Sequence, residues 1–189
     1  DKGFQRALDL AKELNDDQLV LDVNLSIVEK IVSNRNKVEY LYAAAELSEK
    51  LGKENTKELY QKTFDTMMEV DPFYTNLHGL LTIADEKLRD IDSRILAREK
   101  AFERYHRLST FSDNERKKLL NELCELTIHV GDYQKAAELY SRNSKPLAGV
   151  NLLLNNGLVE EGIEYANKNL NDQKLVAQLA IDNQRPDLA

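Results

Sequence analysis

The chain has 189 residues, of which 42% are hydrophobic, and a formal net charge of −7. That hydrophobic content excludes a disordered chain, and the negative charge argues against a general nucleic-acid binder, which needs a basic surface to neutralise phosphates. Gly totals 7, Pro 3 and Trp 0, while Leu, Ala, Glu and Lys predominate, as in helical proteins.

Nothing in the sequence indicates membrane insertion or secretion. No apolar run approaches the roughly 20 residues of a membrane span, and no signal peptide stands at the front. The single cysteine, Cys124, excludes an internal disulfide and a cysteine-based zinc site, and it fits a reducing compartment. We therefore expect a cytoplasmic protein. Because the chain begins at Asp1 rather than Met, we also expect a processed or excised piece.

Apolar residues recur three and four positions apart through the first part of the chain, which is typical of amphipathic helices. The pattern predicts helices over 2–14, 19–33 and 38–51, a fourth one marked by Leu59, Tyr60 and Phe64, and two more over 73–89 and 91–108. Polar residues at 15–17 and 33–36 are expected to form the first two turns.

Residues with strong end preferences mark several of these boundaries. Gly52 is placed to end the third helix as the residue after its C-cap. Asp71 can cap the helix over 73–89, and Pro72 suits its first position, where no backbone donor is needed. The segment 112–115 reads Ser-Asp-Asn-Glu, which is a capping box at the start of another helix.

The helices become shorter towards the end of the chain. The helix opened by the capping box is expected to end at Gly131, and the next one to start at Tyr133. Three more are predicted over 146–154, 158–170 and 172–183. In total we expect about eleven helices and no strand. Most connections are a few residues long, so successive helices should be antiparallel neighbours.

The stretch from Gly131 to Tyr140 combines a tight turn with the start of a helix. Tyr133, Ala136 and Tyr140 fall on one helical face, where the small Ala136 lets a neighbouring helix come close. Tyr140 then fills the space one turn later. The stretch resembles the second half of a tetratricopeptide-type helix pair, and this resemblance implies an all-α superhelix, or α-solenoid.

Two regions of the chain can be laid on the tetratricopeptide pattern. In each region, the matching residues of a first helix are followed on the second helix by a small or aromatic residue and, four positions later, by an aromatic residue. The first region uses Ala44, Leu47, Ser48, Leu51, Tyr60, Phe64 and Pro72, and the second uses Leu120, Leu123, Cys124, Thr127, Ala136 and Tyr140. The large aromatic that opens the family's pattern is absent from both, and Ser48 and Cys124 stand where the pattern has Gly.

The last third of the chain repeats at a shorter spacing. Gly131 and Gly157 lie 26 residues apart, and Ala136, Gly162 and Ala189 take the same small-residue place after 26 and 27 residues. This resembles the compact helical repeats of vesicle-coat, tethering and ciliary-transport scaffold subunits. We expect one solenoid over 1–189, with a possible subdivision at 1–110 and 111–189. It ends in mid-repeat and is therefore expected to be a fragment of a longer chain.

Tetratricopeptide grooves are lined by residues of the first helix of each pair. The resemblance therefore implies a protein-binding surface formed by Lys118, Asn121, Glu122, Glu125 and His129. In the earlier region the same register selects Tyr42, Ala45, Glu46 and Glu49. The family's clamp for an acidic peptide tail is suggested only by Lys118 and Asn121, and the glutamates beside them would repel such a tail.

Other reactive or charged residues have simpler interpretations. His78, His106 and His129 lack the i, i+4 spacing of a helical zinc site, so no metal or other cofactor is predicted. Cys124 is expected to be buried as a small apolar residue. A basic run is either a docking patch for an acidic partner or a solvated face with interleaved acids: Arg94, Arg98, Lys100, Arg104 and Arg107.

Together these observations favour a non-enzymatic scaffold or adaptor that binds a protein or peptide along its helical surface. One alternative is an assembly segment within a coat, tethering or transport subunit, as part of a larger complex. The other is an all-α regulatory or sensor domain that binds a small ligand between helices. An open groove favours the first two, whereas a closed bundle around a polar cavity favours the third.

Overall fold

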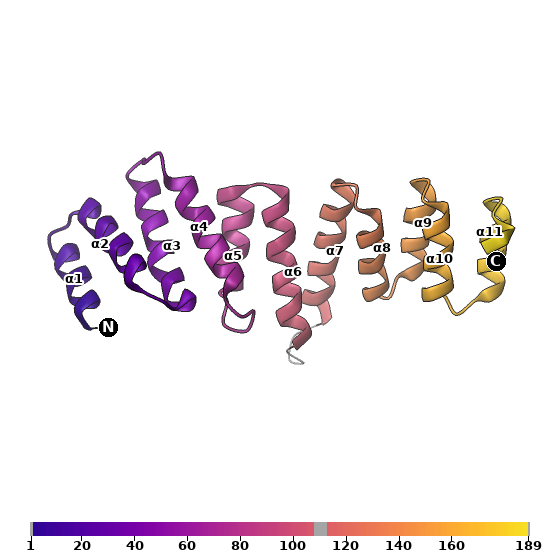
Figure 1. The fold of residues 1–189 in the computed structure, drawn as a ribbon, viewed down its shortest axis with the longest axis horizontal. Coiled ribbons are helices and arrows are strands. Elements are labelled where there is room, and N and C mark those ends of the chain that lie inside the picture. Colours follow the sequence, from indigo (N-terminus) through magenta and orange to yellow (C-terminus); the bar gives the residue numbers. More distant parts are fainter. Residues whose placement is uncertain (1, 108–112, 189) are drawn as a thin grey trace. The chain divides into compact units, whose positions relative to one another are not determined.

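The computed structural model describes residues 2–107 and 113–188, and these residues form an all-α fold without strands. By contacts the chain divides into two compact units, Asp1–Arg104 and Tyr105–Ala189, which are called unit 1 and unit 2. Within each unit, consecutive helices pack against each other and run in alternating directions (Figure 1). Each unit is described by itself.

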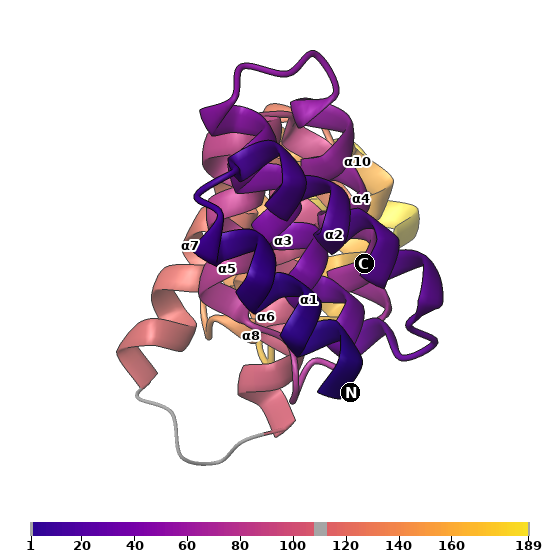
Figure 2. The ribbon, with the colours of Figure 1, turned by 90° about the vertical axis from the view of Figure 1, so that its left-hand side faces the viewer.

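Unit 1 contains the longer helices of the first half. In chain order they are α1 (Lys2–Glu13), α2 (Asp17–Lys30), α3 (Asn34–Lys50), α4 (Thr56–Glu69), α5 (Leu77–Thr82), a π-helix η1 (Ile83–Leu88) and most of α6 (Ile91–Arg107). Figure 2 shows α1 and α2 in front of α3, and each of these helices packs on the next. The main core joins α3, α4 and η1 around three fully buried side chains, Tyr60, Phe64 and Ile83.

Unit 2 contains shorter helices. They are α7 (Asp113–His129), α8 (Tyr133–Arg142), α9 (Pro146–Asn155), α10 (Val159–Asn169), α11 (Gln173–Asp182) and a 3₁₀ turn η2 (Pro186–Leu188). Each of these helices packs on the next one along the chain. The predicted helix start after Asn183 is this 3₁₀ turn, and Ala189 lies outside the described residues, as does Ser112 of the predicted capping box.

Several predicted boundaries in unit 1 were wrong. The turn expected at 33–36 lies at 31–33, because α2 ends at Lys30 rather than Ser33 and α3 already begins at Asn34. The helix expected from Phe73 begins at Leu77, capped by the Asn76 side chain, which accepts a hydrogen bond from the Gly79 amide at 3.1 Å. Asp71 does not cap that helix; its carboxylate accepts from the Phe73 amide at 2.9 Å and closes a local turn.

The second part of the predicted helix 73–89 is a π-helix. In η1 the chain takes wider turns, and the Arg89 amide donates to the Ala84 carbonyl, five residues back, at 3.0 Å. Two charged side chains on η1 reach different neighbours. Asp85 contacts α6 at 3.0 Å from Arg98, and Lys87 contacts α3 at 2.6 Å from Glu49. The sequence pattern has no period that would indicate these wider turns.

In unit 2 a left-handed residue recurs after the helices. Gly131, Ser144 and Gly157 have positive φ and lie thirteen residues apart, and Gln184 repeats the conformation after α11. After each of these residues the next amide donates to a carbonyl five residues back, for example Asp132 to Thr127 at 2.9 Å, which is a Schellman closure. The 26-residue spacing seen in the sequence is therefore two helices of a thirteen-residue period. Leu170, after α10, is extended and breaks the series.

Small residues allow close packing between α8, α9 and α10. A Cβ atom at Gly149 of α9 would lie 2.7 Å from the hydroxyl of Tyr165, so the ring passes directly over this glycine. The Tyr165 hydroxyl then donates to the Ala137 carbonyl of α8 at 2.6 Å. Ser141 and Asn169 add a second link between α8 and α10 at 2.9 Å. One tyrosine thus connects three successive helices.

Candidate functional site

The predicted binding surface lies on one face of α7. Glu125 and His129 are exposed, and the Lys118 side chain is 80% exposed and 4.0 Å from the Glu122 carboxylate. Asn121 is also exposed, but its Oδ1 accepts a hydrogen bond from Asn143 of the α8–α9 turn at 2.8 Å. The five residues are brought together at helical spacing, and their role in binding stays a prediction.

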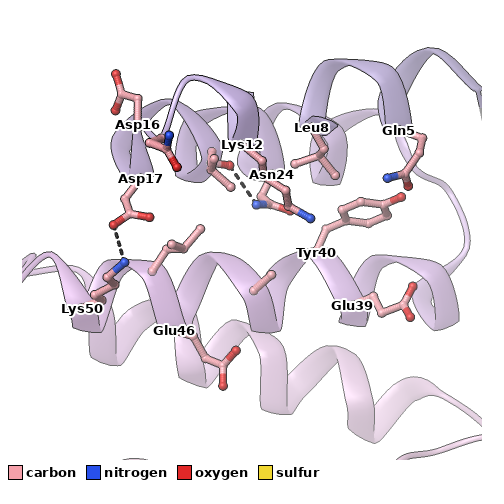
Figure 3. Close-up of a pocket in the computed structure, with 14 residues that line it drawn as sticks. Gln5, Leu8, Lys12, Asp16, Asp17, Asn24, Glu39, Tyr40, Glu46 and Lys50 are labelled. Atoms are coloured by element: carbon pink, nitrogen blue, oxygen red, sulfur yellow. Dashed lines mark hydrogen bonds and ion pairs between the residues drawn. The ribbon is translucent and has the colours of Figure 1, made fainter. Parts of the chain in front are cut away.

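Unit 1 contains a larger feature, which we call the first groove. It has a volume of about 810 Å³ and lies between α1, the first half of α2 and the face of α3 that carries Glu39 and Lys50 (Figure 3). Leu8, Val20 and Leu47 give it an apolar floor. On α3 the lining runs from Glu39 to Lys50, which is eleven residue steps and corresponds to a length of about 16 Å along the helix. The space is therefore an elongated groove along a helix.

Asn24 is a buried polar residue in the lining of this groove. The residue is 3% exposed, and its side chain points from α2 into the space towards α3 (Figure 3). Its Nδ2 donates to the Val20 carbonyl at 2.8 Å. Within the described part of the chain its Oδ1 has no hydrogen-bond partner. A carboxamide with a free acceptor and a second N–H can pair with a peptide group.

The charges around the first groove are unevenly distributed. Lys50 is neutralised by Asp17 at 2.5 Å, and Asp16 caps α2 by accepting from the Leu19 amide at 3.0 Å. Glu39 and Glu46 are exposed on the α3 side, and no Lys or Arg of the described ranges pairs with them. Free negative charge therefore lies along α3, and Lys12 on α1 is the cation opposite it.

A second groove adjoins the first one at Glu39, which lines both. It has a volume of about 470 Å³ and lies between the start of α3, the end of α4 and the turn before α5. Arg35 stands over the ring of Tyr74 at 4.6 Å, and Tyr42, about two turns after Arg35 on α3, also lines this groove. This surface already holds one guanidinium group on a tyrosine ring.

Next to both grooves, α3 carries a partly exposed cation site formed by the chain itself. The Glu49 carboxylate accepts from the Tyr60 hydroxyl at 2.7 Å and from Lys87 Nζ at 2.6 Å, and Lys87 lies 5.2 Å above the Tyr60 ring. These hydrogen bonds, from Lys87 first and then Tyr60, hold the pKa of Glu49 below its usual value. Burial, followed by the bond to Glu49, raises the pKa of Tyr60. A carboxylate and a tyrosine ring together hold one ammonium group here.

The basic residues of α6 form neither the docking patch nor the solvated face that was predicted for them. Arg98 and Lys100 are 6% and 7% exposed, Arg98 pairs with both oxygens of Asp85 at 3.0 Å, and Lys100 donates to the Met68 carbonyl at 2.8 Å. Arg104 donates to the Thr75 carbonyl at 2.9 Å. These cations therefore hold unit 1 together, and the helix period alone could not distinguish inward from outward basic residues. The side chain of Arg107 lies outside the described ones.

Two further predictions concern single residues. Ala45 is fully buried in the core of unit 1, so it does not line a groove as the register on α3 had suggested. Cys124 is buried as expected, its Sγ contacts the Ala136 carbonyl at 3.8 Å, and burial raises the pKa of its thiol to about 11. The thiol is thus protonated at neutral pH.

Asn24 was missed because it lies within an apolar stripe. Val20 precedes it by four residues and Ile27 follows it by three, so the position reads as core. The signal that could have found it is the polar residue at this place, since a buried carboxamide needs hydrogen-bond partners.

Comparison with protein-family models and with curated protein sequences found no match to this chain. Among the residues that the structure describes, no helix has the length and apolar character needed to cross a membrane.

Proposed function

We propose that this chain is a non-enzymatic scaffold or adaptor whose helical surface binds a protein or peptide segment, in the manner of tetratricopeptide-like solenoids. The observation that supports the proposal most is the first groove, which is elongated, open and lined along α3 over about 16 Å. An extended peptide of about five residues has this length. The free thiol of Cys124 fits a reducing compartment such as the cytoplasm.

The α7 face remains a second candidate surface for the same function. Lys118, Glu125 and His129 are exposed and could contact a partner, whereas Asn121 is already engaged by Asn143. An assembly role within a larger complex would use such an exposed helical face and would leave the first groove without a peptide. The two versions of the proposal therefore predict different sensitive residues.

A peptide-display selection on the purified chain tests the proposal. Ala43 lines the first groove, so Ala43→Arg should fill it, and Ala7→Arg on the exposed side of α1 is a matched control. Enriched peptides should bind the wild type and the control but not Ala43→Arg. Loss of binding in Lys118→Glu/Asn121→Ala alone would move the site to α7. Absence of any enriched peptide, or recovery of a tightly held metabolite instead, would overturn the proposal.

A further inference from the structure

The cation site at Glu49 shows what the surface of α3 can bind. Lys87 is held there by a carboxylate at 2.6 Å and by the Tyr60 ring at 5.2 Å. Such a pairing combines ionic attraction with a cation–π contact, so it selects an ammonium or guanidinium group. Both donors to the Glu49 carboxylate come from the chain itself, so this site is filled.

One turn earlier on α3 a carboxylate, Glu46, and a tyrosine, Tyr42, are again neighbours. Burial, followed by the nearby Glu46 carboxylate, raises the pKa of the Tyr42 hydroxyl. Lys87 is near enough to Tyr42 to oppose part of the rise in its pKa, but it pairs with Glu49 and not with Glu46. The Tyr42 and Tyr60 rings meet edge to face at 6.5 Å, so the two sites are adjacent. Within the described ranges no Lys or Arg pairs with Glu46. The same is true of Glu39, which lies between the two grooves.

Asn24 provides an independent indication of a ligand. It is 3% exposed, lines the first groove and leaves its Oδ1 without a partner in the part of the chain that the structure describes. This oxygen keeps some solvent contact at the groove and is available there to a hydrogen-bond donor. A peptide N–H lying in the groove would supply that bond, and Asn24 Nδ2 could donate its second hydrogen in return.

The spacing of the two free carboxylates indicates the form of the ligand. Glu39 and Glu46 are seven residues apart on α3, which places them about 10 Å apart along the helix axis. In a polyproline II segment, residues i and i+3 lie on the same side and about 9 Å apart. Two cations three residues apart in such a segment would therefore match the two carboxylates.

We propose that the first groove binds an extended segment of a partner protein that carries two Lys or Arg residues three positions apart. The cations lie at Glu39 and Glu46, and a backbone amide of the segment pairs with Asn24. This inference rests on the proposed function and specifies the partner's chemistry. The net charge of −7 favours association with a cationic segment. Of the two lysines in the lining, Lys50 is neutralised by Asp17.

The test measures binding of the chain to a labelled, end-blocked peptide, acetyl-Ala-Arg-Ala-Pro-Arg-Ala-amide, by fluorescence anisotropy. Two comparison peptides are used. One has citrulline in place of both arginines, which removes the charges and keeps the shape. The other has the same composition with its arginines adjacent. We expect the first peptide to bind most tightly and its affinity to fall with added salt.

Variants of the chain then locate the contact. Glu39→Gln/Glu46→Gln should raise the Kd about tenfold, since two exposed ion pairs are lost. The matched control is Glu29→Gln/Glu58→Gln, which removes two exposed carboxylates outside the grooves and should leave the Kd unchanged. Asn24→Leu should weaken binding about tenfold without changing its salt dependence. Circular dichroism confirms that each variant is folded.

Equal binding of the arginine and citrulline peptides, or an unchanged Kd in Glu39→Gln/Glu46→Gln, would overturn this inference. So would absence of binding to the wild type. If display selection nevertheless yields other peptides that Ala43→Arg loses, the proposed function stands and only the cationic partner is wrong. If neither experiment detects a peptide, both proposals fail.

Discussion

The two units stabilise their interiors with different chemistry. Unit 1 buries charged groups: Arg98 and Lys100 are the buried charged side chains among the described residues, and their partners lie on η1 and α4. The buried polar residues described in unit 2 are the uncharged Thr127 and Asn143. Its helices instead approach through small residues such as Gly149, and its left-handed turns recur after three successive helices at a spacing of thirteen residues.

This difference follows from how regular each unit is. An irregular element such as η1 does not present a uniform apolar stripe to its neighbours, so specific charged contacts fix its position. Helices of nearly equal length that end in the same turn can pack through complementary size alone. In this chain the buried charged side chains thus lie in the unit that contains the irregular element.

The largest effect is expected from breaking the charged contact of unit 1. Asp85→Ala leaves the Arg98 guanidinium, whose side chain is 8% exposed, without its carboxylate. The free energy of unfolding of unit 1 should fall by about 3 kcal/mol, at the low end for a buried pair because Asp85 itself is one-third exposed. Urea unfolding, with hydrogen exchange of the α6 amides to locate the change, measures it.

The surface pair of unit 2 is the matched control for this prediction. Glu122→Ala removes the partner that lies 4.0 Å from the exposed Lys118 and should cost less than about 0.5 kcal/mol. A loss as large as that of Asp85→Ala would contradict the comparison between the units.

Acidic pH gives a second measure of the Asp85 contact. Burial opposes ionisation of Asp85, but the hydrogen bonds from Arg98 and Arg94 outweigh it, so the pKa of this carboxyl is below its ordinary value. The stabilisation is therefore complete above the unfolded pKa of about 3.9 and is lost as the pH falls through the lower, folded value. The stability difference between wild type and Asp85→Ala should accordingly shrink on acidification below about pH 4.

A smaller effect is expected where unit 2 depends on close approach. Gly149→Ala places a methyl group 2.7 Å from the Tyr165 hydroxyl and should displace the ring from the Ala137 carbonyl. The clash should exceed the gain in helix propensity and destabilise unit 2 by about 1–2 kcal/mol. Gly3→Ala is the control, since a Cβ atom at Gly3 meets nothing within 4 Å and should stabilise α1 slightly.

The left-handed turns give a reciprocal pair of substitutions with smaller effects. Gly131→Ser forces a side chain into φ +81° and should cost about 1 kcal/mol. Ser144→Gly, at φ +58°, relieves a similar strain but adds freedom to the unfolded chain, so the net change should be within about 0.5 kcal/mol. Thermal unfolding of unit 2 compares the two. If the two turns are equivalent, these opposite substitutions should not have the same effect. Equal destabilisation by both would therefore show that the turns are not equivalent.

Much of this fold could be predicted from the sequence because its periodic elements are local. The eleven α-helices of the described residues, the C′ role of Gly52 and the turn at Gly131 follow from apolar spacing and from the conformational freedom of glycine. Ser144 and Gln184 could not be predicted, because neither residue type prefers the positive φ that the closing hydrogen bonds of these turns require. The inward direction of Arg98 also depends on a distant partner, Asp85.

The candidate grooves were less accessible to sequence reasoning than the helices. The register on α3 correctly placed Glu46 at the surface but also selected Ala45, which is buried. A one-residue error of this kind rotates the chosen face by 100°. Asn24 lies on α2, which belongs to neither of the two regions that were aligned with the tetratricopeptide pattern. Only the packing of α1, α2 and α3 brings it to the first groove.

The last prediction concerns the chemical reactivity of the Cys124 thiol rather than the stability of the chain. Because burial raises the pKa of its thiol to about 11, an alkylating reagent should react with native Cys124 at pH 8 at least about 100-fold more slowly than with the unfolded chain. Mass spectrometry of the alkylated protein gives the rates. Rapid reaction in native conditions would show that the interior of unit 2 opens easily.

The spacing of the turns in unit 2 has a consequence for how such a chain can change its length. Gly131 and Gly157 carry the same backbone conformation and enclose two complete helices, α8 and α9. A duplication or deletion of residues 131–156 would therefore place an equivalent turn after α7 and keep every later residue in phase. Insertions of other lengths would have to be absorbed in a loop. Chains related to this one by genetic duplication should thus differ in steps of 26 residues, and a variant that duplicates 131–156 should gain helical circular dichroism in proportion.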